Sequence, residues 1–211
     1  RHASGEHRWI LDQGSPRHDS EGRFLGYVGH CLDLTQVKQA EAKVAHLAYH
    51  DTLTGLPNRA LFQDRLTQAV AAARRSKRLG ALMFIDLDHF KHINDVYGHA
   101  VGDVVLIEVS NRLKFYLRTE DTVARLGGDE FVVLLPALAT EATSAATLAQ
   151  AVGDKIRIAL EAPIHIGETH YHTAASVGLT LFPKGEETVD NLMREADIAM
   201  YRAKESGRNA I

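Results

Sequence analysis

Residues 125–131, which read RLGGDEF, constrain the fold of this chain more than any other stretch. A short run with strand character precedes them at 121–124, and an apolar run follows at 131–135, ended by Pro136. Two strand-like runs joined by Gly-Gly predict a β-hairpin, because the tight turns of hairpins need positive φ, which glycine adopts without strain.

The tip of this predicted hairpin carries two adjacent acids, Asp129 and Glu130. They stand at the head of a strand that is otherwise apolar and predicted to be buried. Carboxylates in that position are electrostatically unfavourable unless a cation is held there. For the Gly-Gly-Asp-Glu stretch considered by itself, a solvated acidic turn is the alternative interpretation.

The size and charge of the chain exclude several classes of function. The 211 residues, 45% of them hydrophobic, suit one generous soluble domain with an appendage. A net charge of −3 gives no overall attraction to nucleic acid or to an anionic membrane surface, so neither is expected as a partner. The single cysteine, Cys31, excludes an internal disulfide and suits a reducing compartment.

No apolar stretch is long enough to span a bilayer, and the first residues do not form a signal peptide. We therefore expect a cytoplasmic location. The chain starts without an initiator methionine and in the middle of a pattern, which is typical of an excerpt, and a membrane anchor upstream stays open.

Residues 1–35 are predicted to form a β fragment. Strands are expected at 8–11, 24–29 and 31–34, with a polar connection up to Gly22. The following features carry a resemblance: Trp9, Asp19-x-x-Gly22, Gly26-x-x-Gly29, Asp33-Leu34-Thr35 and Lys38-x-x-Glu41. Together they resemble the C-terminal end of a PAS sensor domain. The ligand pocket of such a domain would lie mostly upstream, so we assign no sensing function to this part.

Residues 36–50 are predicted to form a linker helix. Val37, Ala40, Val44 and Leu47 fall at heptad spacing, which is typical of a coiled-coil seam. A dimerising helix between a sensor fragment and a following domain is one interpretation. A single amphipathic helix packed on a neighbouring surface is the other.

Residues 51–211 alternate between helical and strand patterns. Helices are expected at 59–77, up to about 117, at 141–160 and at 189–205, the last of them closed by Gly207. Strands are expected at 81–88, in the hairpin, near 164–166 and at 173–182, with a loop at 98–103. This alternation predicts an α/β domain.

Acidic residues lie at the ends of two of these strands. Asp86 ends an apolar strand, whereas Asp129 and Glu130 begin another. If the two strands are neighbours, three carboxylates meet at one rim of the sheet. Oxygen-only clusters of this kind suit Mg²⁺, which shares its remaining coordination sites with water and substrate phosphates. Such a site would support phosphoryl or nucleotidyl transfer, as in a polymerase-like palm.

Five motifs in order make the interpretation specific. They are DTLTGLPNR at 51–59, DLDHFKHIND at 86–95, GHAVGD at 98–103, RLGGDEF at 125–131 and AKESGRN at 203–209. Together they resemble the GGDEF family of diguanylate cyclases, from about Ala48 to the end of the chain. The resemblance implies a palm-like, ferredoxin-like central sheet that is mostly antiparallel and flanked by helices.

The resemblance also implies a reaction, in which two GTP condense into cyclic di-GMP and two pyrophosphates are released. Asp86 and Asp129 would hold Mg²⁺, or Mn²⁺, with help from the Leu87 carbonyl. Glu130 would deprotonate the attacking 3′-hydroxyl or bind a second metal ion, and Lys91 would neutralise charge developing on the phosphate.

Further residues would bind the nucleotide if the resemblance holds. The backbone amides of His89 and Phe90 would contact the terminal phosphates, as an anion nest does. Asn94 and Asp103 would recognise guanine, because a carboxylate accepts from its ring N–H and exocyclic amine. The remaining expected contacts are His99, near the nucleotide, and Lys204 and Arg208, on the β- and γ-phosphates. Lys204 as a helix-end cation and His99 as an ordinary loop histidine are the alternatives.

Arg118 and Asp121 have the Arg-x-x-Asp form of the family's inhibitory product site. A second arginine that often completes this site is not evident at 140–150, which puts high-affinity feedback in doubt. One domain would bind one GTP, so the reaction requires a homodimer. Two rivals stay open: a catalytically silent GGDEF module that serves as a GTP or cyclic di-GMP receptor, and a cyclase with relaxed base choice. The twelve histidines lack the spacing and the cysteines of a zinc site.

Overall fold

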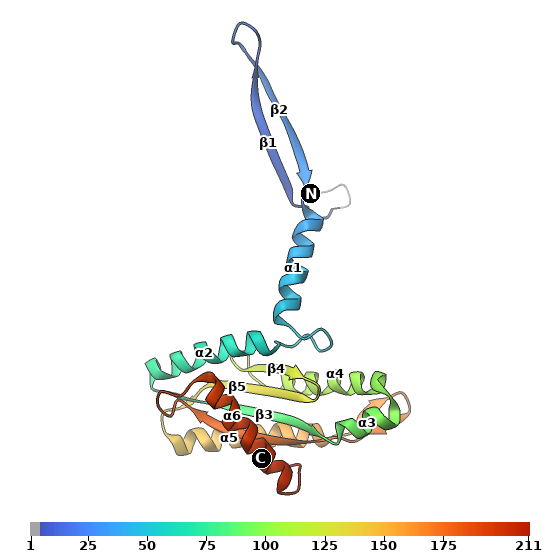
Figure 1. Ribbon diagram of the computed structural model, residues 1–211, viewed down its shortest axis with the longest axis vertical. Coiled ribbons are helices and arrows are strands. Elements are labelled where there is room, and N and C mark those ends of the chain that lie inside the picture. The colour runs from blue at the N-terminus through green and yellow to red at the C-terminus, as the bar shows by residue number, and fades with distance from the viewer. Residues whose placement is uncertain (1–4) are drawn as a thin grey trace. The chain divides into compact units, whose positions relative to one another are not determined.

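The structure is a computed structural model that describes residues 5–211, and the chain divides into two compact units at Ala48 and Tyr49. The N-terminal unit contains the antiparallel hairpin of β1 (Ile10–His18) and β2 (Phe24–Asp33), followed by α1 (Thr35–Tyr49) (Figure 1). The predicted helix is therefore present. Its apolar residues Val37, Val44 and Leu47 are exposed in the single chain.

The prediction of a polar connection up to Gly22 is wrong for most of these residues, because the chain as far as His18 belongs to strand β1. The turn lies later, where the Asp19 carboxylate accepts hydrogen bonds from the backbone N–H groups of Glu21 and Arg23. With the turn fixed there, residues 10–18 pair with 24–33. Pro16 is compatible with this strand because a two-stranded hairpin has only edge strands.

The larger unit alternates helices with strands. Its elements are α2 (Arg59–Ser76), β3 (Leu79–Asp88), α3 (Phe90–Tyr97), α4 (His99–Tyr116), β4 (Thr122–Gly127), β5 (Glu130–Ala139), α5 (Ala142–Glu161), β6 (Ile164–Ile166), β7 (Thr169–Tyr171), β8 (Ala174–Phe182) and α6 (Val189–Glu205). Asn58 begins α2 by accepting a hydrogen bond from the Leu61 N–H, as its position in the sequence predicts.

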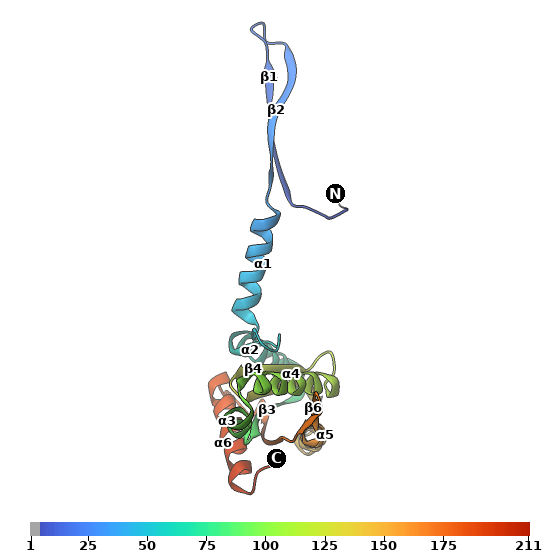
Figure 2. The ribbon, with the colours of Figure 1, turned by 90° about the vertical axis from the view of Figure 1, so that its right-hand side faces the viewer.

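Four of these strands form the central sheet, in the order β4-β5-β3-β8. Every neighbouring pair is antiparallel. Helices α4 and α5 cover one face, and α2 and α6 cover the other (Figures 1 and 2). The predicted fold class, an α/β domain with a mostly antiparallel central sheet flanked by helices, is confirmed.

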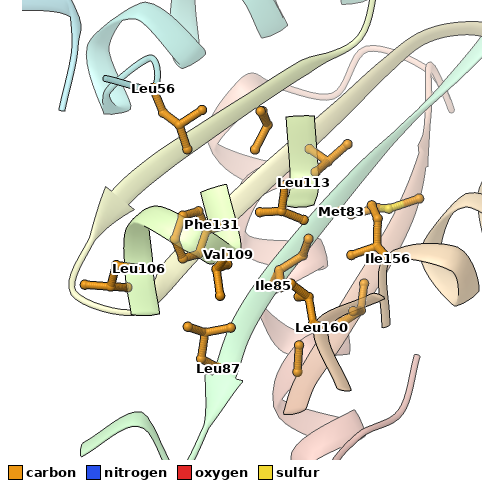
Figure 3. Close-up of a cluster of buried hydrophobic side chains, with 14 of the residues drawn as sticks. Leu56, Met83, Ile85, Leu87, Leu106, Val109, Leu113, Phe131, Ile156 and Leu160 are labelled. Atoms are coloured by element: carbon orange, nitrogen blue, oxygen red, sulfur yellow. The ribbon is translucent and has the colours of Figure 1, made fainter. Parts of the chain in front are cut away.

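The alternation of side chains along β3 divides the core between these two layers. Met83, Ile85 and Leu87 pack toward α4 and α5, as Figure 3 shows together with Leu113 and Ile156. Even-numbered residues of β3 face the opposite layer, where the partners of Leu82 and Phe84 include α2 and α6 residues. Burying each large apolar side chain stabilises the fold by about 1.5–3 kcal/mol. The same alternation places Asp86 and Asp88 on the side of α6.

A close approach of β8 to α6 holds that layer tightly against the sheet. A side chain at Gly178 would collide with the backbone of Ala196 and Met200 in α6. Only glycine allows α6 to lie this close to the strand. The end of α6 is thereby brought next to the acidic end of β3.

Two boundaries in this unit differ from the prediction. β5 continues past Pro136 to Ala139. Proline is tolerated there because β4 pairs with β5 only as far as Leu134, so that β4 needs no N–H from residue 136. The segment 98–103, expected as a loop, forms the start of α4, with Gly98 at positive φ between α3 and α4. Strand β7 was not predicted, because its polar sequence resembles a loop.

Among the described residues, no helix is long and apolar enough to cross a membrane.

Candidate active site

The ends of β3 and β5 bring the predicted acids together. Asp86 lies directly opposite Glu130 in the antiparallel pairing, and the Leu87 N–H donates to the Asp129 carbonyl at 3.4 Å. Both glycines of the hairpin have positive φ, 148° at Gly127 and 51° at Gly128. The turn that glycine permits therefore places the Asp129–Glu130 pair beside the end of the buried strand.

Asp86 is the buried member of this group, with 8% of the residue exposed. Burial raises the pKa of its carboxyl group, and the neighbouring Asp129 and Asp88 raise it further. One contact opposes this shift: the Lys204 ammonium, from the last turn of α6, lies 2.7 Å from Asp86 Oδ1. A predicted phosphate-binding lysine thus neutralises a predicted metal ligand.

The donor set at this rim consists of oxygens only, from Asp86, Asp129 and the Leu87 carbonyl. Such a set fits Mg²⁺ or Mn²⁺ and does not fit a soft metal. Within residues 5–211, no group of three or more His, Cys, Asp or Glu side chains is arranged to hold a metal ion.

Arg125 fixes the shape of the hairpin. Its Nε and Nη2 atoms donate to the Gly128 carbonyl at 2.9 and 2.8 Å, and its Nη1 atom donates to both oxygens of Asp51 at 3.0 and 3.2 Å. The Arg125 N–H donates to the Pro57 carbonyl. One arginine therefore joins the Gly-Gly turn to the turn that precedes α2. Arg125 and Asp51 both belong to motifs of the family resemblance, but no role was predicted for either residue.

Replacing Arg125 by methionine should loosen the hairpin and lower both stability and activity. Charged hydrogen bonds of this kind contribute on the order of 1.5–3 kcal/mol, so the melting temperature should fall by several degrees. Arg112→Met is the matched control, because Arg112 donates to the carbonyls of Ala159 and Pro163, away from the hairpin. Thermal unfolding should report a loss for both variants, whereas turnover below the transition should fall only for Arg125→Met. Equal turnover of the two variants would show that Arg125 has no specific effect on the site.

The start of α3 lies directly after Asp88. His89 has a left-handed backbone with φ 60°, and helical residues follow it. Successive N–H groups in such a turn point to one side and form an anion-binding nest. Phe90 is buried in the core and fixes this turn, whereas the Lys91 side chain is exposed.

Asn94 in α3 lies against Gly102 of α4, the residue that precedes Asp103. The Asn94 amide packs so closely on Gly102 that any side chain at position 102 would displace it. Asp103 follows on the first turns of α4 and is exposed. His99 begins α4 and is also exposed.

The chain after α6 returns to the end of β3. Arg208 is exposed and has φ 65°. The N–H of Asn209 donates to Asp88 Oδ2 at 2.9 Å, and Ser176 Oγ donates to Asp88 Oδ1 at 2.9 Å. No role was predicted for Asp88 or Ser176 from the sequence. The spacing of two between Asp86 and Asp88 was the available signal, since it places both side chains on one face of the strand.

Arg118 and Asp121 lie together in the turn between α4 and β4. The Asp121 carboxylate accepts from the Arg118 N–H at 2.9 Å, which closes the turn and leaves the Arg118 side chain exposed. Burial raises the pKa of Asp121. The two residues are adjacent but do not form an ion pair with each other among the described contacts.

Comparison with known proteins decides the family. The model of the family described as "Diguanylate cyclase, GGDEF domain" matches residues 48–210. The chain belongs to the GGDEF family. This GGDEF chain is 46% identical over 175 residues to the bifunctional diguanylate cyclase/cyclic di-GMP phosphodiesterase MucR of Pseudomonas aeruginosa, a match that covers 83% of the chain and 25% of MucR.

Two solved structures are also similar to this GGDEF chain. The GGDEF domain of TpbB from Pseudomonas aeruginosa is 42% identical, with a TM-score of 0.71, and the match covers 76% of this chain and 91% of that one. The coiled coil and GGDEF domain of DgcB from Caulobacter crescentus, solved in complex with c-di-GMP, is 30% identical, with a TM-score of 0.73, and the match covers 83% of this chain and 92% of that one. The chain spans 25% of MucR and 39% of full-length TpbB.

Proposed function

We propose that this chain is the catalytic part of a diguanylate cyclase, which condenses two GTP into cyclic di-GMP and releases two pyrophosphates. The observation that carries the proposal is the pairing of Asp86 with Glu130 across β3 and β5, with Asp129 in the same turn and Lys204 against Asp86. Nucleotidyl transfer requires acids that can hold a metal ion and a cationic side chain that can bind phosphate, and both lie at this rim of the sheet.

In this proposal Asp86, Asp129 and the Leu87 carbonyl hold Mg²⁺, with Mn²⁺ as an equivalent. The ion, when bound, supplies positive charge to the α-phosphate and to the attacking oxygen. Lys204 then leaves Asp86 and becomes available to the β- and γ-phosphates, together with Arg208. The same lysine therefore keeps Asp86 neutralised before the substrate arrives.

Glu130 accepts the proton of the 3′-hydroxyl, and Lys91 neutralises charge on the phosphate in the transition state. The 3′-oxygen forms a bond to the α-phosphorus of the facing nucleotide while the bond to the bridging oxygen breaks and pyrophosphate leaves. A second such step closes the ring. The proposed role of Glu130 as a ligand of a second metal ion is compatible with this proton transfer.

The nucleotide is oriented by the elements that follow β3. The amides of His89 and Phe90 take the terminal phosphates, and Asn94 with Asp103 takes the guanine edge. His99, at the start of α4, lies near the nucleotide in this proposal. Because Asp103 is an acceptor, ATP would leave its carboxylate without a matching donor pair.

A homodimer is part of the proposal, since each domain contributes one nucleotide. We infer that residues 1–35 end a PAS-like sensor domain, that 36–50 form the linker helix and that 51–211 form the cyclase domain. The exposed heptad residues of α1 would set how the two sites meet. Arg118 and Asp121 would bind cyclic di-GMP as feedback inhibitor. GTP as substrate and the single cysteine favour the cytoplasm.

The alternative is a silent GGDEF module that binds GTP or cyclic di-GMP without turnover. Asp86, Asp129, Glu130 and Lys91 are all present, which favours the enzyme. Incubation with GTP and Mg²⁺, followed by chromatography, should give cyclic di-GMP and two equivalents of pyrophosphate, and no product from ATP. Binding without product would establish the silent module, and product from both nucleotides would establish relaxed base choice.

The dimer has its own expected result. Specific activity should fall as the protein is diluted through its dimer dissociation constant, because two half-sites must meet. Activity and mass from light scattering should change over the same concentration range. Undiminished specific activity in a monomer would contradict the proposed assembly.

A further inference from the structure

Asp88, the last residue of β3, is a buried carboxylate whose two oxygens both accept hydrogen bonds from the chain. Only 4% of Asp88 is exposed. Oδ1 accepts from Ser176 Oγ, which is fully buried in β8, and Oδ2 accepts from the Asn209 N–H. A carboxylate used in this way joins β3, β8 and the segment after α6.

The segment after α6 has a backbone that needs such support. Gly207, Arg208 and Asn209 have φ of 127°, 65° and 48°. Two successive non-glycine residues in the left-handed region are unfavourable unless the surrounding contacts fix them. The bond from the Asn209 N–H to Asp88 is a charge-assisted contact at the end of this turn.

Further contacts hold the end of the chain against β8 and α5. The Val177 N–H donates to the Ala210 carbonyl at 2.8 Å, so the tail runs along the outer edge of β8. The Asn209 side chain contacts Glu161, and Arg157 donates to it at 3.3 Å. Three sets of contacts therefore hold the tail: the backbone bond to Asp88, the bond between Val177 and Ala210, and the side-chain network on α5.

We propose that Asp88 is a positioning residue, which fixes the turn after α6 and thereby directs Arg208, and Lys204 in the preceding helical turn, toward the rim at Asp86. It acts on the triphosphate through these two cations and is not itself a metal ligand. The inference rests on the proposed function for the substrate and for the phosphate-binding roles of Lys204 and Arg208, whereas the contact between Asp88 and the turn after α6 is independent of it. The rival role for Asp88 is that of a third cation-binding carboxylate, next to Asp86.

Asp88→Asn and Asp88→Ala separate the two roles. The asparagine oxygen can still accept from the Asn209 N–H, and its amide can donate to Ser176 Oγ, so the contacts survive without the charge. Asp88→Asn should keep kcat and KM for GTP within about threefold of the parent chain. Asp88→Ala should raise KM about tenfold or more, with a smaller change in kcat. If Asp88→Asn is as inactive as Asp88→Ala, the charge itself is needed and the proposal is overturned.

Hydrogen exchange of the Asn209 amide, in the absence of metal and nucleotide, tests the contact apart from the activity. Exchange at Asn209 should be about tenfold faster in Asp88→Ala than in the parent chain and near the parent rate in Asp88→Asn. Unchanged exchange in Asp88→Ala would overturn the proposal even in an active enzyme. A parent chain that makes no cyclic di-GMP would remove the proposed function and leave this measurement decisive for Asp88.

Asn209→Gly is the matched control for the side-chain network. It keeps the N–H that bonds Asp88, favours positive φ and removes the contacts with Glu161 and Arg157. KM for GTP should stay within about threefold of the parent value. A rise in KM as large as that of Asp88→Ala would show that the α5 network fixes the tail, and Asp88 would lose its assigned role.

Discussion

Asp86→Asn should abolish GTP turnover, by at least about a thousandfold, without lowering the stability of the metal-free chain. Asparagine removes the charge that would hold the ion but keeps the size of the side chain. The pKa of Asp86 is raised in the folded chain, chiefly by burial. A raised carboxyl pKa means that ionisation disfavours the folded state. This destabilisation is absent below the ordinary pKa and is fully present above the raised one.

At neutral pH the asparagine variant should therefore melt at the same temperature as the parent in EDTA, or at a higher one. Lys204 loses its partner, but its side chain is 28% exposed and can be hydrated. As the pH falls through the raised pKa, the difference between the two proteins should shrink, and it should vanish below the ordinary carboxyl pKa. A markedly lower melting temperature for Asp86→Asn would show that the pair with Lys204 stabilises the apo fold on balance.

Glu195→Gln provides a control of opposite sign. Hydrogen bonds from Lys184 and Thr180 lower the pKa of Glu195, so its ionised form favours the folded state above the ordinary pKa. That contribution is lost as the pH falls through the lowered value. Glu195→Gln should thus be slightly less stable at neutral pH and fully active, because Glu195 lies on α6 away from the acidic rim.

Glu130→Gln should reduce kcat by about 10²–10⁴ while GTP still binds. Glutamine has nearly the same shape as glutamate but cannot accept the proton of the 3′-hydroxyl. The nearest cation, Arg59, lies 3.9 Å from the Glu130 carboxylate, and both side chains are largely solvated, so the fold should not depend on this pair. Calorimetry with a non-hydrolysable GTP analogue should give an affinity within a few fold of the parent value.

Glu120→Gln is the matched control for this substitution. Glu120 is also an exposed acid 3.9 Å from an arginine, Arg118, but it lies in the turn before β4. Its turnover should equal that of the parent protein. Turnover retained in Glu130→Gln would remove Glu130 from the chemistry. Loss of nucleotide binding together with turnover would instead assign Glu130 to binding.

Local periodicity was sufficient to predict most helices and strands and to place acids at the ends of two strands. Alternation fixes which residues of β3 face α6, and the Gly-Gly turn fixes where Asp129 and Glu130 begin β5. The order of strands in the sheet is a tertiary property: the family resemblance implied a mostly antiparallel sheet, and the structure shows that β3 and β5 are neighbours. The boundaries at 98–103 and at Pro136 were wrong because glycine and proline were interpreted as breaks, whereas the neighbouring elements accommodate them.

The contacts that hold the site were not predictable from the same patterns. Arg125 reaches Asp51 across 74 positions of the chain, and Asp88 reaches Asn209 across 121. No local period connects such pairs. The strand at 10–18 was missed for a related reason, since its polar residues gain strand structure only by pairing with β2. The resemblance of residues 1–35 to a PAS domain stays a prediction.

In the proposed mechanism, Asp86 and Asp129 share a divalent cation at the rim of the sheet. Crystals grown with Mn²⁺ and a non-hydrolysable GTP analogue, measured for anomalous scattering, test it most directly. We predict a manganese peak about 2.0–2.2 Å from oxygens of Asp86, Asp129 and the Leu87 carbonyl, with Lys204 moved from Asp86 to a phosphate. A nucleotide bound without that peak, and with Lys204 still paired to Asp86, would contradict the account.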